Sequence, residues 1–168
     1  MNNPQEILLP ARQAFIYFSL GLALLLNFFP WQDSGWYWHP DFLSLTILYW
    51  SAYQPRKIGM GLPWILGLII DVGYGTVLGQ YAITYALLAF YGIYTHRRMA
   101  LFNPFEQMLQ IIPPLLAARG LLFLLGRMFG GHWAGPMFIP GVTLEILLWP
   151  LTVILLQMPQ RPRTDNDT

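Results

Sequence analysis

The sequence predicts an all-α, polytopic membrane protein, built as a bundle of about six transmembrane helices. Of its 168 residues 55% are hydrophobic and only 10% are charged, whereas soluble domains carry about 25% charged residues. Long apolar runs alternate with short segments rich in proline, glycine, tryptophan or basic residues. A soluble chain of this length would need more polar surface, so residues 1–168 are predicted to form a single integral membrane domain.

The first predicted span runs from Ala14 to Phe29, after a short polar tail at about 1–12. It has no small-residue cleavage pattern, so it is expected to remain in the protein rather than be removed as a signal peptide. At about 16 residues it is slightly short of the roughly 20 that a full crossing needs, and flanking residues can extend it.

A tryptophan-rich loop, Trp31–Pro40, follows and contains neither lysine nor arginine. It is typical of a membrane interface, with a sugar-stacking site as the alternative. Pro40 and Asp41 open the second span, because proline suits the first turn of a helix and aspartate its positive end. This span is predicted to run to about Tyr53.

The third and fourth spans share Gly59–Tyr94 and turn near Gly73–Gly79, just before a basic group at His96–Arg98. About 36 residues is close to the minimum for two crossings, so their connection must be tight.

One carboxylate, Asp71, lies inside this apolar stretch and is either a functional group or a structural hydrogen-bonding residue. Gly67, Gly75 and Gly79 flank it at steps of four. These glycines let another backbone approach closely, as a helix-packing site or a groove for a partner helix, or they serve as turn residues.

The fifth span, about Pro104–Gly126, contains Pro113 and Pro114 before Arg119. Two adjacent prolines remove two backbone donors, so this helix is predicted to bend or break at mid-membrane.

An outer loop, Gly130–Pro136, leads to the sixth span, about Phe138–Gln157, and a polar tail at about 158–168. Glu145 of the sixth span and Arg119 of the fifth are expected at similar depth, so they can form an ion pair. Asp71, at a similar depth, completes the predicted intramembrane cluster of Asp71, Arg119 and Glu145. The alternative is that Arg119 extends outward alone.

The basic residues predict the topology. With six crossings, all but two of them fall on one side, which the positive-inside rule makes cytoplasmic together with both termini. The residues on that side are Arg12, Arg56, Lys57, Arg97, Arg98, Arg161 and Arg163, while Arg127 falls on the other side and Arg119 within a span.

Several kinds of site are disfavoured. The chain has no cysteine, and His39, His96 and His132 are far apart, so no metal site or cofactor is expected. A net charge of +1 without a basic cluster does not suggest nucleic acid. The sequence contains no nucleotide-binding loop, nucleophile elbow or histidine–glutamate motif, and its serines have no plausible histidine partner, so no catalytic residue is proposed.

An ordered set of motifs resembles one family. It comprises Pro40-Asp41-Phe42, Tyr49-Trp50 with Pro55, Gly67-Leu-Ile-Ile-Asp71, Gly75-Thr-Val-Leu-Gly79 and a basic group before the fifth span. Together they resemble the rod shape-determining protein MreD family over nearly the whole chain.

The resemblance implies a protein of the bacterial inner membrane that works in the cell-wall elongation complex. The implied partners are the transmembrane helix of MreC, the actin-like MreB indirectly, and a penicillin-binding transpeptidase with its polymerase partner. The family is also similar in fold to the substrate-binding subunits of energy-coupling-factor transporters.

Two functions follow. The first is a non-catalytic scaffold that helps to maintain rod shape and peptidoglycan synthesis, with the MreC helix or a neighbouring copy docked beside Gly67, Gly75 and Gly79. The second is a membrane subunit of a transporter that binds a vitamin or a lipid-linked precursor, which would need several convergent polar groups in its outer half.

Overall fold

The computed structural model describes residues 11–29, 40–99, 101–129 and 139–160, and this part of the chain contains helices and no strands. The all-α prediction is therefore confirmed for these residues. The helices are α1 (Gln13–Phe28), α2 (Phe42–Tyr53), the short α3 (Pro55–Ile58), α4 (Gly61–Tyr74), α5 (Gln80–Met99), α6 (Pro104–Met128) and α7 (Ile139–Gln157), followed by a 3₁₀ turn, η2 (Met158–Gln160).

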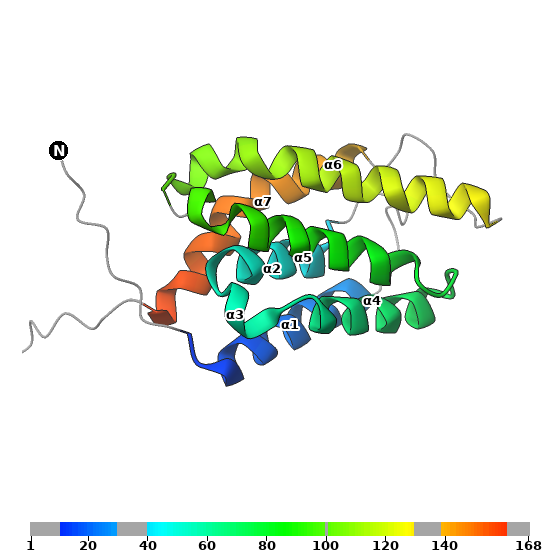
Figure 1. The fold of residues 1–168 in the computed structure, drawn as a ribbon, viewed down its shortest axis with the longest axis horizontal. Coiled ribbons are helices and arrows are strands. Elements are labelled where there is room, and N and C mark those ends of the chain that lie inside the picture. Colours follow the sequence, from blue (N-terminus) through cyan, green and yellow to red (C-terminus); the bar gives the residue numbers. More distant parts are fainter. Residues whose placement is uncertain (1–10, 30–39, 100, 130–138, 161–168) are drawn as a thin grey trace, which may run out of the picture.

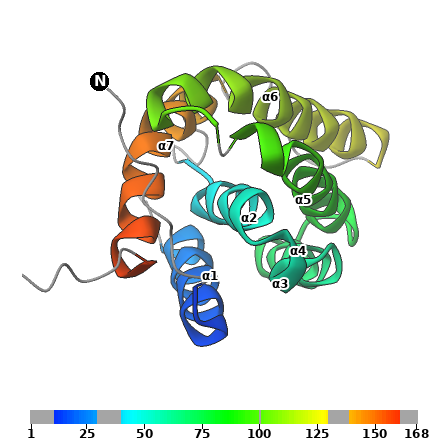
Figure 2. The same ribbon diagram turned by 60° about the vertical axis from the view of Figure 1, so that its left-hand side comes forward.

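Helix α2 is the centre of the molecule, with α1, α4, α5, α6 and α7 arranged around it (Figure 2). Ten of its twelve residues are buried, including Leu43, Tyr49 and Trp50. Apolar side chains point in every direction from this helix, and a helix without a polar face is stable only when its whole circumference is covered.

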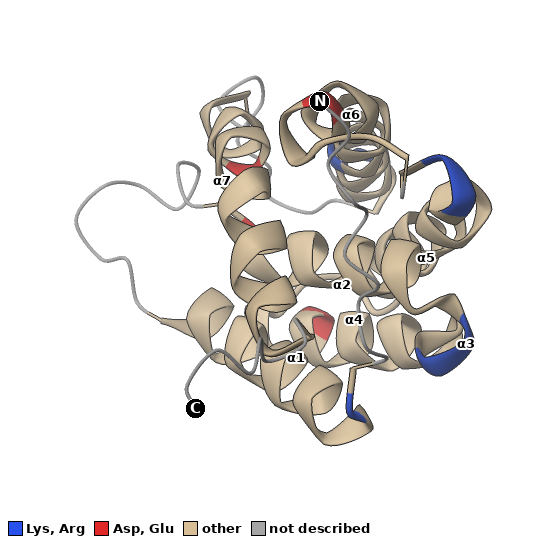
Figure 3. Ribbon diagram, turned by 90° about the vertical axis from the view of Figure 1, so that its left-hand side faces the viewer, with Lys and Arg blue, Asp and Glu red and all other residues tan. Residues whose placement is uncertain are grey.

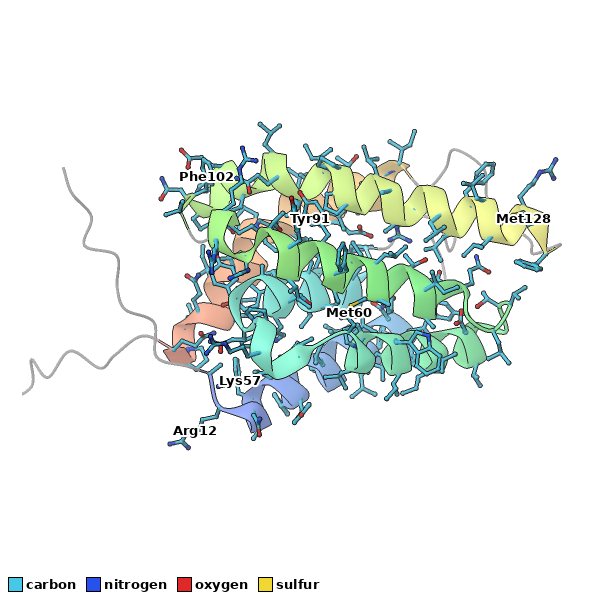
Figure 4. The ribbon with its side chains drawn as sticks, in the orientation of Figure 1. Arg12, Lys57, Met60, Tyr91, Phe102 and Met128 are labelled. Atoms are coloured by element: carbon cyan, nitrogen blue, oxygen red, sulfur yellow. The ribbon has the colours of Figure 1, made fainter. Side chains whose placement is uncertain are left out.

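The six longer helices alternate in direction along the molecule (Figure 1). Helices α1, α4 and α6 start at the end where α2 and α5 finish. That end, called the basic end below, carries Arg12, Arg56, Lys57, Arg97 and Arg98, and the blue segments of Figure 3 lie there on α3 and α5. Figure 4 shows Arg12 and Lys57 at one end of the bundle and Met128 at the opposite end.

Two helical segments have the length and composition of membrane spans: Pro104–Met128, with 25 residues, and Ile139–Gln160, with 22. Helices α1, α2 and α4 are apolar but shorter. Large apolar side chains are exposed on the helices that surround α2, among them Phe18, Leu25, Val72, Leu109 and Leu147. An apolar exterior around a centre that contains polar groups is the arrangement that lipid favours.

The sequence predicts a bend or a break at the two prolines, and α6 does not break there, because it is one continuous helix with Pro113 and Pro114 inside it. In an α-helix, the N–H of residue 114 would donate to the carbonyl of Gln110, and proline has no N–H. The hydroxyl of Tyr91 on α5 takes its place and donates to the Gln110 carbonyl at 3.0 Å. A neighbouring helix thus satisfies one of the acceptors that the prolines release.

Candidate functional site

Asp71 is fully buried near the end of α4, and its carboxylate caps the start of α5. One oxygen accepts hydrogen bonds from the Thr76 hydroxyl at 3.0 Å and the Tyr81 N–H at 2.8 Å. The other accepts from the N–H groups of Gly79 at 2.9 Å and Ala82 at 3.3 Å. The positive end of a helix stabilises a carboxylate, so the geometry is that of the structural alternative for Asp71.

The three glycines beside Asp71 have two different uses. Gly75, with φ 64°, and Gly79, with φ 99°, lie in the turn between α4 and α5, where a left-handed backbone requires glycine. Gly67 is a packing residue, because a Cβ built there would lie 2.4 Å from the Cα of Ala82 on α5.

This contact shows which neighbour lies against Gly67. Helix α5 of the same chain occupies the space beside Gly67, so this glycine packs two helices of the bundle together, as in the helix-packing alternative.

Arg119 of α6 and Glu145 of α7 form an ion pair between the Nη2 atom of the arginine and Oε1 of the glutamate. The side chains are 15% and 1% exposed, so the pair is well covered by protein. Asp71 makes its hydrogen bonds at the α4–α5 turn instead, and the structure places it outside this pair.

A second carboxylate, Asp41, lies next to this ion pair. Its backbone N–H donates to Oε1 of Glu145 at 3.0 Å, the same oxygen that receives Arg119. Its own carboxylate accepts from the Asn27 amide at 2.7 Å, the Ser44 N–H at 3.0 Å and the Tyr85 hydroxyl at 2.8 Å.

Asn27, which belongs to α1, brings α1 and α4 into these contacts. Its side-chain oxygen accepts from the N–H of Phe42 at 3.0 Å, and its backbone carbonyl accepts from the Tyr74 hydroxyl at 2.9 Å. A single polar network therefore joins all six longer helices, through Asn27 of α1, Asp41 at the start of α2, Tyr74 of α4, Tyr85 of α5, Arg119 of α6 and Glu145 of α7.

The network is negatively charged overall when both carboxylates are ionised, since Arg119 is its one cation. The start of α2 offsets part of this charge, because its N–H groups point at Asp41 and Glu145 and the helix dipole is positive there. Oε2 of Glu145 is buried and has no hydrogen-bond partner. A buried oxygen without a hydrogen bond costs about 1–3 kcal/mol, so this atom offsets part of the stabilisation that the network provides.

The basic end holds a separate neutral cluster around Gln107 of α6. The side-chain amide of Gln107 donates to the Tyr53 hydroxyl at 2.7 Å and accepts from the indole N–H of Trp149 at 3.1 Å. This cluster ties α2, α6 and α7 together at the end opposite the polar network.

Sequence reasoning identified Arg119 and Glu145, and it read Asp41 only as the residue that opens a helix. Asn27, Tyr74 and Tyr85 were missed. A lone amide at the end of the first apolar run was a usable signal for Asn27, whereas nothing distinguishes Tyr85 from the eight other tyrosines.

In the described ranges, no three histidine, aspartate or glutamate side chains lie close enough together to hold a metal ion. Of the three histidines, His96 contacts the carbonyl of Ile93 at 2.7 Å through Nδ1. The other two, His39 and His132, lie outside the described residues, as do Arg161, Arg163, the loop 130–136 and nearly all of the loop 31–40.

Comparison with known proteins gives one consistent result. The family model described as rod shape-determining protein MreD matches residues 11–159. The chain is 26% identical over 143 residues to the rod shape-determining protein MreD of Haemophilus influenzae, which covers 83% of this chain and 86% of that protein. No solved structure matches the chain.

Proposed function

This chain belongs to the rod shape-determining protein MreD family, and from that premise we propose that it is a non-catalytic inner-membrane scaffold of the bacterial cell-wall elongation complex. The family is concerned with rod shape determination. In the proposed role the protein holds other components together, and so maintains cell shape and supports peptidoglycan synthesis without a reaction or cofactor of its own.

The polar network is the observation that carries this proposal. Nearly all of its polar groups bond to one another, so six helices are fixed in one arrangement and few groups remain for a substrate. A rigid bundle with an apolar exterior presents a constant surface to partner helices. A transporter subunit, in contrast, needs convergent polar groups that are free to receive its ligand.

We propose that the whole chain forms one multi-pass membrane domain with six crossings and the basic end in the cytoplasm, together with both termini. The described basic residues of that end, from Arg12 to Arg98, support this orientation by the positive-inside rule, and Arg127 directly precedes Met128, which Figure 4 shows at the other end.

The short α2 fits a membrane location because it is surrounded by protein. Its 12 residues cover about 18 Å, well below the roughly 30 Å of the hydrocarbon layer. A helix can start inside the layer only where other parts of the protein satisfy its free N–H groups. Asp41, Asn27 and Glu145 supply those acceptors.

The proposed partners are those that the family implies: the transmembrane helix of MreC, MreB indirectly, and the penicillin-binding transpeptidase with its polymerase partner. The exposed apolar faces around α2 offer surface for a single helix or for a neighbouring copy of this protein. No nucleic acid is expected among the partners.

Depletion in a rod-shaped host, combined with affinity purification from gently solubilised membranes, tests the scaffold. We expect rounded cells on depletion and recovery of MreC with the wall synthases. Arg119→Ala should abolish rescue, while Arg12→Gln, which changes an exposed charge at the basic end, should rescue fully. Rods that keep their shape during depletion would contradict the proposal.

The alternative function is a membrane subunit of a transporter that binds a vitamin or lipid-linked precursor. One observation favours it: the buried, unpartnered oxygen of Glu145 could receive a hydrogen-bond donor from a ligand. The likeness to energy-coupling-factor subunits remains part of this alternative. Impaired uptake of one vitamin on depletion, and a transporter ATPase in the purified material, would favour it over the scaffold.

A further inference from the structure

An apolar groove lies between α5 and α6, away from the polar network. It encloses about 230 Å³ and is lined by Thr84, Leu88 and Tyr91 of α5 and by Pro114, Ala118 and Leu121 of α6. Figure 4 shows Tyr91 between these two helices. The groove opens to the exterior beside Leu87 and Phe90, which line it and are 51% and 53% exposed.

The sequence of α6 explains why a hollow exists here. Pro114, Ala118 and Leu121 recur at helical spacing and face α5, and proline and alanine are too short to fill the space between the helix axes. The polar groups at the groove are already used, because Thr84 donates to the Gln80 carbonyl and Tyr91 to the Gln110 carbonyl. The occupant therefore needs no hydrogen-bonding groups, which describes a hydrocarbon chain.

An exposed cation, Arg98, lies on the same helix as the groove, toward the basic end. Thr84, Tyr91 and Arg98 are seven residues apart on α5, which is close to two full turns, so they lie along one face. Side chains on a helix lean toward its N-terminus, so Arg98 leans back toward the turn that carries Tyr91. Arg98 is exposed and has no carboxylate partner within the described part of the chain.

We propose that this groove is a binding site for an anionic phospholipid, with one acyl chain between α5 and α6 and the phosphate at Arg98. The positive charge of Arg98 matches the anionic headgroup of such a lipid, and the apolar groove matches its acyl chain. Arg97, next to Arg98 on α5, and Arg56 and Lys57 on α3 lie at the same basic end and add to its positive charge. The inference rests on the proposed membrane placement and is independent of the protein partners.

Native mass spectrometry of the full chain in mild detergent tests the site. Phosphatidylglycerol and phosphatidylethanolamine with identical acyl chains are titrated separately. We expect one phosphatidylglycerol to bind more tightly than phosphatidylethanolamine. Arg98→Gln should weaken phosphatidylglycerol binding by about tenfold or more, since hydrogen bonds to charged groups are strong. The matched control Arg12→Gln removes an exposed charge at the same end and should leave binding unchanged.

A second variant tests the hydrocarbon part. Ala118→Phe fills the hollow and should weaken binding of both lipids, and its thermal unfolding is measured beside that of the control Ala14→Phe to show that it is folded. Equal binding of the two lipids by the unchanged protein, or equal effects of Arg98→Gln and Arg12→Gln, would overturn the proposal. A protein helix in place of lipid would also overturn it, seen as cross-linking from Ala118→Cys to another polypeptide in native membranes.

Discussion

At the residue scale, the ion pair between Arg119 and Glu145 can be tested directly by mutation. Removing one partner of a buried pair leaves an uncompensated charge, which costs about 3–5 kcal/mol. Arg119→Ala should therefore destabilise the protein strongly, measured as thermal unfolding in detergent micelles. The additional change Glu145→Gln should recover part of the loss, because it removes the unpaired charge and keeps an acceptor for the Asp41 N–H.

The result for the double variant decides whether the pair is real. A coupling free energy of about 0.5–3 kcal/mol between the two positions is expected for side chains in contact. If the change in unfolding free energy of the double variant equals the sum of the two single changes, Arg119 and Glu145 do not interact.

Asp71 gives a second prediction at this scale. Asp71→Ala removes four hydrogen bonds from the α4–α5 turn, so the N–H groups of Gly79, Tyr81 and Ala82 should exchange with deuterium much faster. Loss of a helix cap alone costs about 0.5–2 kcal/mol. Thr76→Val, which removes one of the four donors, should have a smaller effect, and unchanged exchange in Asp71→Ala would argue against the cap.

Sequence reasoning reached part of this chemistry. Arg119 and Glu145 could be paired from their depths along two antiparallel helices, since both are charges in apolar runs. The sequence left two roles open for Asp71, a functional group or a structural hydrogen-bonding residue. The N–H donors that distinguish them belong to the backbone of Gly79, Tyr81 and Ala82. Backbone donors have no signature in the sequence.

At the element scale, two glycines in helices make a matched pair for prediction. Gly67→Ala places a methyl group 2.4 Å from a backbone atom of α5, so it should push the helices apart and lower the unfolding temperature. Gly120→Ala in α6 meets nothing within 4 Å and should stabilise the protein by about 0.5–1 kcal/mol, since alanine favours a helix over glycine. Equal effects at both positions would contradict the close contact.

The hydrogen bond from Tyr91 across to α6 gives another prediction. Tyr91→Phe leaves the Gln110 carbonyl without its donor and should cost about 1 kcal/mol in thermal unfolding. In a Pro114→Ala background the new N–H of residue 114 can bond to Gln110, so Tyr91→Phe should then cost less. An equal cost in both backgrounds would show that Tyr91 does not replace the missing donor.

The positions of the six longer helices were predictable because apolar runs bounded by proline, glycine and basic residues define them, whereas the short α3 was not predicted. Helices α4 and α5, which correspond to the third and fourth predicted spans, turn between Tyr74 and Gln80, and α5 continues through the basic group to Met99. The continuity of α6 was not predictable, because the group that compensates for Pro114 lies on another helix.

At the scale of the whole molecule, topology is open to test because the chain contains no cysteine. Single cysteines can therefore be introduced and labelled without reaction at any native thiol. Arg56→Cys should react with an impermeant thiol reagent only from the cytoplasmic side, and Thr76→Cys only from the outer side. Labelling of both from one side would contradict the proposed alternation of six crossings.

The arrangement of the helices around α2 could not be derived from the sequence. The composition predicted a helical bundle, and the basic residues predicted which ends lie together. Helix α2 is central because its side chains, such as Tyr49 and Trp50, are covered by protein on all sides. A helix that faces lipid has a similarly apolar composition, so the sequence does not distinguish the two cases.

The polar network also has a consequence for biosynthesis. Asp41 is translated long before Glu145, the acceptor for its N–H, so a nascent chain that ends in α5 carries a helix start with an unmatched donor. Such a chain gains its stable form only after α6 and α7 have left the translocon. Nonsense truncations before Glu145 should therefore be removed by membrane proteases, whereas the full-length chain accumulates, because the start of α2 gains its acceptor only when α7 is present.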